Sequence, residues 1–196
     1  MPRTNRKGLP SSWALAALFF AAFGAAQATT INARSPSVTD VRTAIASAAD
    51  GDTVIVPAGT AVWRDALTIT KGITLQGQTT TDSTNGTAVD NTIIQDSDAR
   101  RRPGGYPFIT VNSQAGKTYR ITGLTIDGGG ATTMNYNGAI VLAGNSHSVR
   151  VDHMNWRANV TRENNNYLIA GSVCGVGDHI VIKNPCESYA IYNGDT

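Results

Sequence analysis

The stretch Tyr119-Arg-Ile-Thr-Gly-Leu-Thr-Ile126 is the first of three with one pattern, and Val149-Arg-Val-Asp-His-Met-Asn-Trp156 and Cys174-Gly-Val-Gly-Asp-His-Ile-Val-Ile182 are the others. In each stretch, two short runs with apolar residues at every second position meet at a bend. A period of two is typical of strands that bury one face. Leu67 to Leu75 shows the same alternation around a bend at Thr70-Lys-Gly72. The pattern predicts a unit of two strands joined at a tight corner, with Cys174 and Val176 facing inward.

A third kind of strand precedes each later pair. Its members start 31, 28 and 22 positions apart and are Phe108-Ile-Thr-Val111, Ala139-Ile-Val-Leu142, Tyr167-Leu-Ile-Ala170 and Tyr189-Ala-Ile-Tyr192. Three strands per repeat describe a unit that buries its apolar face only by stacking on its neighbours. We therefore predict an all-β fold, a right-handed parallel β-helix. A β-sandwich is the alternative, but Asn-Gly hairpin turns do not join these strands, since Asn85-Gly86 and Asn137-Gly138 fall in longer loops.

One helix precedes the strands. Apolar residues recur at helical spacing over 38–49, Ser37 or Thr39 can cap the start, and Asp50-Gly51-Asp52 ends the run. Coils begin at about Val54. Because the open end of a coil exposes backbone groups and apolar side chains, we expect the helix to cover it. No equivalent cap follows the last strand, so we expect the chain to be the N-terminal part of a longer protein, monomeric when complete; a partner or dimer on the open end is the alternative.

Residues 1–28 have the features of a secretory signal peptide. A basic start is followed by the apolar run Trp13–Phe23 and by Ala26-Gln-Ala28, an A-x-A end. Without them, residues 29–196 form one domain of 168 residues with 13 basic and 14 acidic side chains, a net charge of −1 against +2 for the whole chain. This balance argues against a nucleic-acid partner. We expect an extracellular or periplasmic protein without a membrane span after cleavage; a retained N-terminal anchor is the alternative.

The stretch Ser37-Val-Thr-Asp-Val-Arg-Thr-Ala-Ile-Ala-Ser-Ala-Ala-Asp-Gly-Asp-Thr-Val-Ile-Val-Pro-Ala-Gly-Thr60 resembles the N-terminus of secreted pectate-lyase-like proteins of the pectin lyase superfamily. Lys71-Gly-Ile-Thr-Leu-Gln-Gly77 looks like the strand that follows there. The resemblance covers most of the mature chain and implies a parallel β-helix. It does not name an activity, because this scaffold carries lyases, hydrolases, epimerases and inert adhesins.

The resemblance also implies where a substrate lies: along the sheet of the third kind of strand, flanked by the loops 76–91, 127–137, 157–166 and 183–188. Loop 157–166 holds the candidate catalytic residues Arg157, Arg162 and Glu163 among four Asn side chains. A lyase needs a base for the proton alpha to a uronate carboxylate, and cations to neutralise that carboxylate. The competing interpretation is a solvated turn loop. The basic loop Asp98-Ala-Arg-Arg-Arg-Pro-Gly-Gly105 has the same two interpretations.

Other polar residues favour structural roles or stay open. The pairs Asp152-His153 and Asp178-His179 lie at corners, where Asp suits tight turns, and His147 is a lone loop histidine. Ca²⁺ is a possible cofactor, although Asp127 and Glu163 are few carboxylates for six or more oxygen ligands. Cys174 and Cys186 can form a disulfide or remain two buried thiols.

The sequence therefore predicts a secreted protein that acts on or binds an acidic polysaccharide, with lyase chemistry ahead of hydrolysis. The alternative is a non-catalytic, adhesin-type solenoid that binds glycans or protein partners through a strand face.

Overall fold

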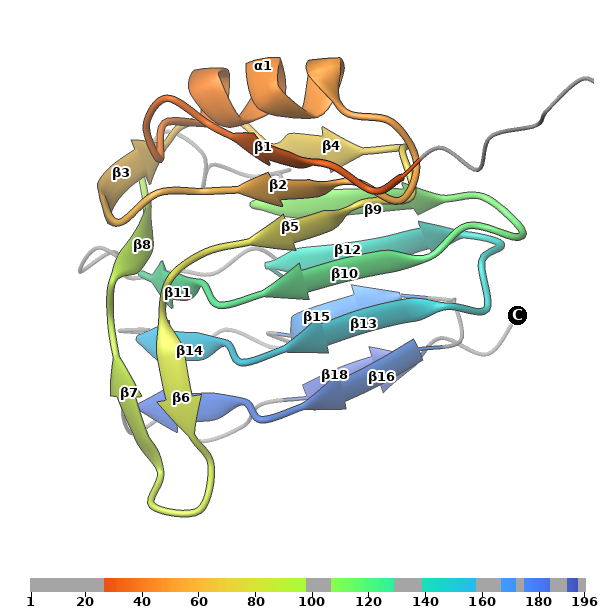
Figure 1. Ribbon diagram of the computed structural model, residues 1–196. Helices are drawn as coiled ribbons and strands as arrows, with labels where there is room; N and C mark the ends of the chain where they lie inside the picture. The colour runs from red at the N-terminus through yellow and green to blue at the C-terminus, as the bar shows by residue number, and fades with distance from the viewer. Residues whose placement is uncertain are drawn as a thin grey trace, which may run out of the picture.

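The computed structural model describes residues 27–97, 107–128, 139–157, 167–171, 175–183 and 190–193. Three stacked sheets of parallel strands make up most of it (Figure 1). Sheet A holds β1 (Thr30–Asn32), β2 (Thr53–Ile55), β5 (Thr74–Gln76), β10 (Tyr119–Thr122), β13 (Val149–Asp152) and β16 (Gly175–Asp178). Sheet B holds β3 (Gly59–Trp63), β8 (Thr92–Asp96), β11 (Thr125–Asp127), β14 (Asn155–Arg157) and β17 (Val181–Lys183). Sheet C holds β4 (Leu67–Ile69), β9 (Ile109–Ser113), β12 (Ile140–Gly144), β15 (Tyr167–Gly171) and β18 (Ala190–Asn193).

The chain visits the sheets in a fixed order, from C to A to B and back to C one strand further along. We call three consecutive strands, one from each sheet, a layer; β9–β11, β12–β14 and β15–β17 are successive layers. Every strand pairs in parallel with its equivalent in the next layer. The arrangement is consistent with a β-solenoid, and the expected third kind of strand is sheet C.

The core consists of inward side chains stacked in register between layers. The rows, read through the strand pairs, are Val54, Leu75, Ile121 and Val151 in sheet A, Ile94, Ile126 and Trp156 in sheet B, and Leu67, Ile109, Ile140 and Ile169 in sheet C. Both Trp63 and Trp156 are fully buried, as the alternation predicts for Trp156. Because each row runs through several layers, apolar burial couples every layer to its neighbours.

Helix α1 (Val38–Ser47) covers the first strands and lies across the top of the stack in Figure 1. Its buried side is Val38, Val41, Ala44 and Ile45, which confirms the predicted cap, two residues shorter than the expected range 38–49. Ser37 caps the start, accepting a hydrogen bond from the Asp40 N–H at 3.2 Å. At the other end, Lys71 Nζ donates to the carbonyl oxygens of Ile45, Ala46 and Ala48 at 3.0, 2.7 and 2.6 Å.

A β-hairpin replaces a tight corner after β5. Strands β6 (Thr80–Asp82) and β7 (Thr87–Val89) pair antiparallel and run across the strand ends of the later layers, at the left of Figure 1. Asn85 and Gly86 lie in its turn. The expectation that 76–91 flanks sheet C is therefore wrong, because these residues connect sheet A to sheet B. Asn85-Gly86 therefore joins two antiparallel strands and does not lie in the plain longer loop that the sequence predicts; the short strands on either side lack the alternating apolar pattern that would identify them.

Two further expectations are corrected by the strand pairing. Leu67 and Leu75 do not repeat the later corner, because β4 belongs to sheet C and β5 to sheet A. Val176 faces outward and is 58% exposed, since Gly175 and Gly177 lie opposite Val149 and Val151. The corner at Asp178 and His179 fixes the register of β16 against β13. This register keeps Val176 outward although an apolar side chain prefers burial. Its neighbour Cys174, like Cys186, lies outside the described residues.

The predicted signal peptide also falls outside, because the description begins at residue 27. In the portion of the chain that is described, no helix has the length and apolar character needed to span a membrane.

The contacts of Lys71 lead to a stability prediction for the cap. Replacing Lys71 with Met keeps the aliphatic stem but removes the donor from three carbonyls at the helix C-terminus. We expect Lys71→Met to lower the free energy of unfolding by about 1–2 kcal/mol, measured by denaturant titration. The matched control Arg34→Met removes an exposed cation and should change the free energy of unfolding by less than about 0.5 kcal/mol. Equal stability of the two variants would contradict the capping role.

Candidate functional site

The outer face of sheet C carries no charged side chain in β4, β9, β12 and residues 169–171, the part of the sheet whose side chains are described. By strand alternation, its outward side chains are Thr68, Thr110, Asn112, Val141, Ala143 and Ala170. All are small or of medium size, and none carries a titratable group. A flat, neutral strip of this kind provides a floor for an extended ligand and no catalytic acid or base.

Exposed polar residues border this floor where the strands of sheet C end. Gln114 follows β9, and Asn145 and His147 follow β12. Ser146, between the latter two, is buried and donates to the Lys117 carbonyl oxygen at 2.6 Å, which fixes this turn. Amide and imidazole groups supply donors and acceptors suited to sugar hydroxyls. His147 thus lies at the edge of the floor, with no triad around it in the described parts.

The opposite edge of sheet C receives the longest connections of the chain. They lead from sheet B to sheet C and comprise 97–108, 128–139, 158–166 and 184–189. Corners from sheet A to sheet B are only two residues long in the later layers, as at Gly123–Leu124 and His153–Met154. Variable loops on a regular scaffold are the usual position of binding residues. Arg162 and Glu163, predicted as catalytic, belong to one of these connections and lie outside the described residues.

Arg157, the third predicted catalytic residue, lies on sheet B. It ends β14, and its guanidinium contacts Asp90 Oδ2 at 3.4 Å and Asp127 Oδ2 at 3.9 Å. Two carboxylates of the chain therefore already neutralise this cation. Its predicted role in catalysis remains a prediction, and its location is a sheet away from the floor formed by sheet C.

Asp90 is the centre of this cluster on the outer face of sheet B. Its Oδ1 accepts hydrogen bonds from Thr125 Oγ1 at 2.8 Å and from the Asn155 amide, while Oδ2 faces Arg157. Thr125 and Asn155 are fully buried, because the leg of the hairpin that holds Asp90 covers them. Sequence reasoning does not find this role of Asp90, since nothing local shows that a loop residue returns over β11 and β14.

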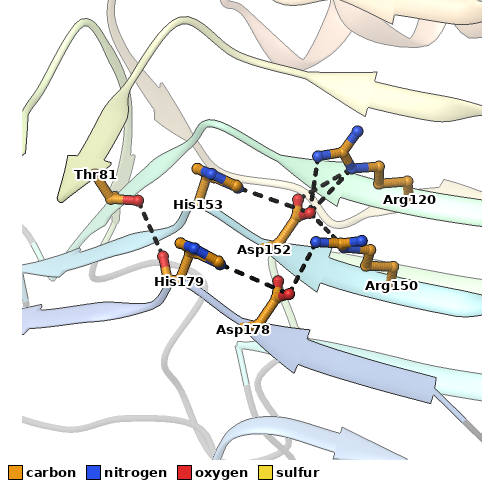
Figure 2. A network of polar contacts seen from close by, with 7 residues as sticks. All are labelled: Thr81, Arg120, Arg150, Asp152, His153, Asp178 and His179. Carbon is orange, nitrogen blue, oxygen red and sulfur yellow. Dashed lines mark hydrogen bonds and ion pairs between the residues drawn. The ribbon is translucent and has the colours of Figure 1, made fainter. Parts of the chain in front are cut away.

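A second polar network lies at the corner between sheets A and B (Figure 2). Asp152 accepts from Arg120 Nε at 3.1 Å and Nη2 at 2.8 Å, and Arg150 bridges Asp152 to Asp178 with contacts of 2.5 and 2.8 Å. His153 and His179 follow the two aspartates, with φ near +50° and ring centroids 4.7 Å apart in parallel planes.

This corner has the structural role expected for the Asp-His pairs. Equivalent residues of in-register parallel strands lie one strand spacing apart, which accounts for the stacked rings. Asp152 is fully buried, which by itself raises the pKa, but hydrogen bonds from Arg120 and Thr122 and the charges of Arg120 and Arg150 hold the pKa below the ordinary aspartate value of 3.8. The network therefore stabilises a charged carboxylate inside the stack.

No three His, Cys, Asp or Glu side chains gather into a metal-binding group within the described ranges. The possible Ca²⁺ cofactor thus has no candidate ligand set among these residues.

Comparison with models of known families, with characterised proteins and with solved structures found no match to this chain.

The buried charge of Asp152 leads to a prediction about stability. Asp152→Asn keeps the shape but leaves Arg120 without its carboxylate and Arg150 with Asp178 alone, so we expect a loss of about 2 kcal/mol in the free energy of unfolding. The control Asp178→Asn changes a carboxylate that is 34% exposed and contacts a single arginine, and it should cost clearly less. Similar losses for both variants would contradict the central role of Asp152.

The pKa of Asp152 also predicts the response to acid. The folded-state pKa of Asp152 lies below the unfolded value of 3.8. The contribution of Asp152 to the free energy of unfolding is therefore complete above about pH 5 and is lost as the pH falls through the folded-state pKa. Asp50 and Asp52 have lowered pKa values too, so the wild type and the Asp152→Asn variant should both lose stability in acid. The difference between wild type and Asp152→Asn should stay constant above about pH 5 and shrink below about pH 4, in denaturation curves measured across that range.

Proposed function

We propose that this chain is a secreted right-handed parallel β-helix protein of the pectate-lyase-like kind, which binds an acidic polysaccharide along the outer face of sheet C. The observation that carries the proposal is the in-register row of small outward residues on this sheet, Thr68, Thr110, Val141 and Ala170. A polymer lying along the stack would meet a similar surface on β4, β9, β12 and β15. Ligands of repeating chemistry suit a repeating floor.

The two edges of the floor supply the polar groups that such a ligand needs. Gln114, Asn145 and His147 provide hydrogen-bonding groups at one edge. The connections at the other edge include Arg100-Arg-Arg102 and Arg162 in the sequence. Arginine binds carboxylates in bidentate fashion, which favours a polymer of uronic acids over a neutral one.

For lyase chemistry, those connections supply the candidate catalytic residues. Elimination removes the proton alpha to the uronate carboxylate, forms a carbon–carbon double bond and breaks the bond to the leaving oxygen, which then takes a proton. The six outward residues named above on β4, β9, β12 and β15 carry no titratable group, and Arg162 and Glu163 stay the candidate residues for this step. Arg157 is less suited, because Asp90 and Asp127 pair with it.

A second candidate function is binding without catalysis, as in an adhesin-type solenoid. The neutral floor of sheet C favours it directly, since binding needs shape and hydrogen bonds alone. The two functions share the same ligand site and differ only in product formation.

The proposal is tested by binding of polygalacturonate, with dextran as the neutral comparison. Thr110→Trp places a bulky ring on the floor, and we expect it to weaken polygalacturonate binding at least about tenfold, or 1.4 kcal/mol, in calorimetry. Thr74→Trp is the matched control, an outward threonine of sheet A, and should leave affinity unchanged. Release of UV-absorbing unsaturated products would identify a lyase, and binding without them the adhesin-type function.

Equal affinity for polygalacturonate and dextran, or loss of binding in Thr74→Trp alone, would overturn the placement of an acidic polysaccharide on sheet C.

A further inference from the structure

Three different donors converge on one carboxylate at the outer face of sheet B. A hydroxyl from Thr125, an amide from Asn155 and a guanidinium from Arg157 all face Asp90. Hydroxyl, amide and guanidinium groups together can satisfy both oxygens of a carboxylate. The arrangement has the composition of a carboxylate-binding site, with a residue of the same chain in the place of a ligand.

The donors are held independently of the carboxylate. Thr125 lies on β11, and Asn155 and Arg157 lie on β14, two paired strands of sheet B. Ile126 and Trp156, buried between them on the inner face, fix the direction of the flanking side chains. Asp90, in contrast, lies in the segment between β7 and β8, outside any strand. Donors on rigid strands and an acceptor on a connecting segment mean that the acceptor can leave without disturbing the donors.

The hairpin that carries Asp90 is held to the layers mainly by polar contacts. Gly77 and Thr79 donate backbone hydrogen bonds to the carbonyls of Thr122 and Gly123 at 2.9 and 2.8 Å, at its base. Farther out, Thr81 Oγ1 donates to the His179 carbonyl at 3.0 Å, visible in Figure 2. Val89, the largest apolar side chain of its two strands, is 61% exposed. A two-stranded hairpin without a buried apolar face opens more readily than the stack.

We propose that Thr125, Asn155 and Arg157 form a binding site for the carboxylate of a uronic acid, and that Asp90 occupies this site as an internal competitor. An external carboxylate takes the place of Asp90 when the Asp90 side chain swings out, while the next residue, Asn91, stays bound to Gly59 N–H and the Gln78 carbonyl oxygen at 2.7 and 3.0 Å. The side chain of Asp90 is 19% exposed, so the site opens to solvent on one side. Because Asp90 belongs to the same chain, its effective concentration at the site is about millimolar or more. This competition lowers the affinity of the wild type for external ligands.

The surroundings favour a uronic acid over an acidic peptide. Asp127 lies 3.9 Å from the Arg157 guanidinium and leaves the cluster with a second negative charge. A single carboxylate on a sugar ring replaces Asp90 charge for charge, whereas a run of carboxylates is repelled by Asp127. Gln95, in register with Asp127 on the outer face, adds an amide for sugar hydroxyls. This site lies on sheet B and does not depend on ligand binding to sheet C.

Chemical rescue of Asp90→Ala tests the proposal on the whole chain. The variant removes the internal carboxylate, so we expect a lower Tm than the wild type and a saturable increase of Tm with D-galacturonate or acetate. D-galactose, which lacks the carboxylate, should give no increase. The apparent affinity for galacturonate should be at least about tenfold higher in Asp90→Ala than in the wild type, because the competitor is absent.

Two further variants serve as controls. Asp82→Ala removes a different carboxylate of the same hairpin, one that pairs with Asn85, and galacturonate should not raise its Tm. Asp90→Ala combined with Arg157→Ala should lose the rescue. Equal effects of galacturonate and galactose, or rescue that survives loss of Arg157, would overturn the site. Stronger rescue by a tri-aspartate peptide than by galacturonate would overturn the uronic-acid assignment.

A measurement on the wild type covers the case in which Asp90→Ala does not fold. Titration with galacturonate at high concentration should shift the NMR signals of the Asn155 side-chain amide and the Arg157 Nε–H, and galactose should not. Unchanged signals at saturation would overturn the proposal. Loss of polygalacturonate binding in Thr110→Trp with rescue of Asp90→Ala intact would separate this site from the one on sheet C.

Discussion

A backbone corner of two residues, repeated in three successive layers, joins β10, β13 and β16 of sheet A to the strands of sheet B that follow them. Its first residue is Gly123, His153 or His179, each with φ between +50° and +68°. The left-handed conformation costs a residue with a Cβ about 1 kcal/mol, yet it bends the chain from sheet A into sheet B within two residues. Because every layer turns at the same position, strands pair in register without slippage, and equivalent side chains lie one strand spacing apart.

Stacking of equivalent residues has consequences on both sides of the sheets. Inside, it places apolar residues on one another, as in the row Ile109, Ile140 and Ile169, so that the apolar rows are continuous. On the polar side, stacking places like charges next to each other. Ion pairs between successive layers offset this repulsion. Arg120 and Arg150 are stacked, as are Asp152 and Asp178, but each aspartate contacts the arginine of the layer before it. Alternating charges in this geometry turn a repulsive stack into a ladder of ion pairs.

The hairpin shows how a change at one corner affects several layers. It replaces the two-residue corner after β5 and then runs over the corners that follow. A Cβ on Gly123 would lie 2.7 Å from the Gly77 carbonyl oxygen, so this close approach requires glycine, whereas the corners farther along accommodate histidine. The segment after the hairpin places Asp90 over Thr125 and Asn155. The polar side chains on this part of the outer face of sheet B therefore bind a residue of the same chain and not solvent.

The sequence by itself determined the stack of parallel strands, the third kind of strand and the N-terminal helix, because these depend on local alternation, capping and spacing. It also indicated that the Asp-His corners are structural. Only the tertiary structure decided the outward position of Val176, the sheet assignment of Leu67 and Leu75, and the partners of Arg157. These depend on register across layers, where a fixed corner outweighs the burial of one valine, and on Asp90, which reaches β14 from 65 residues away. No periodicity within a segment encodes a contact of that separation.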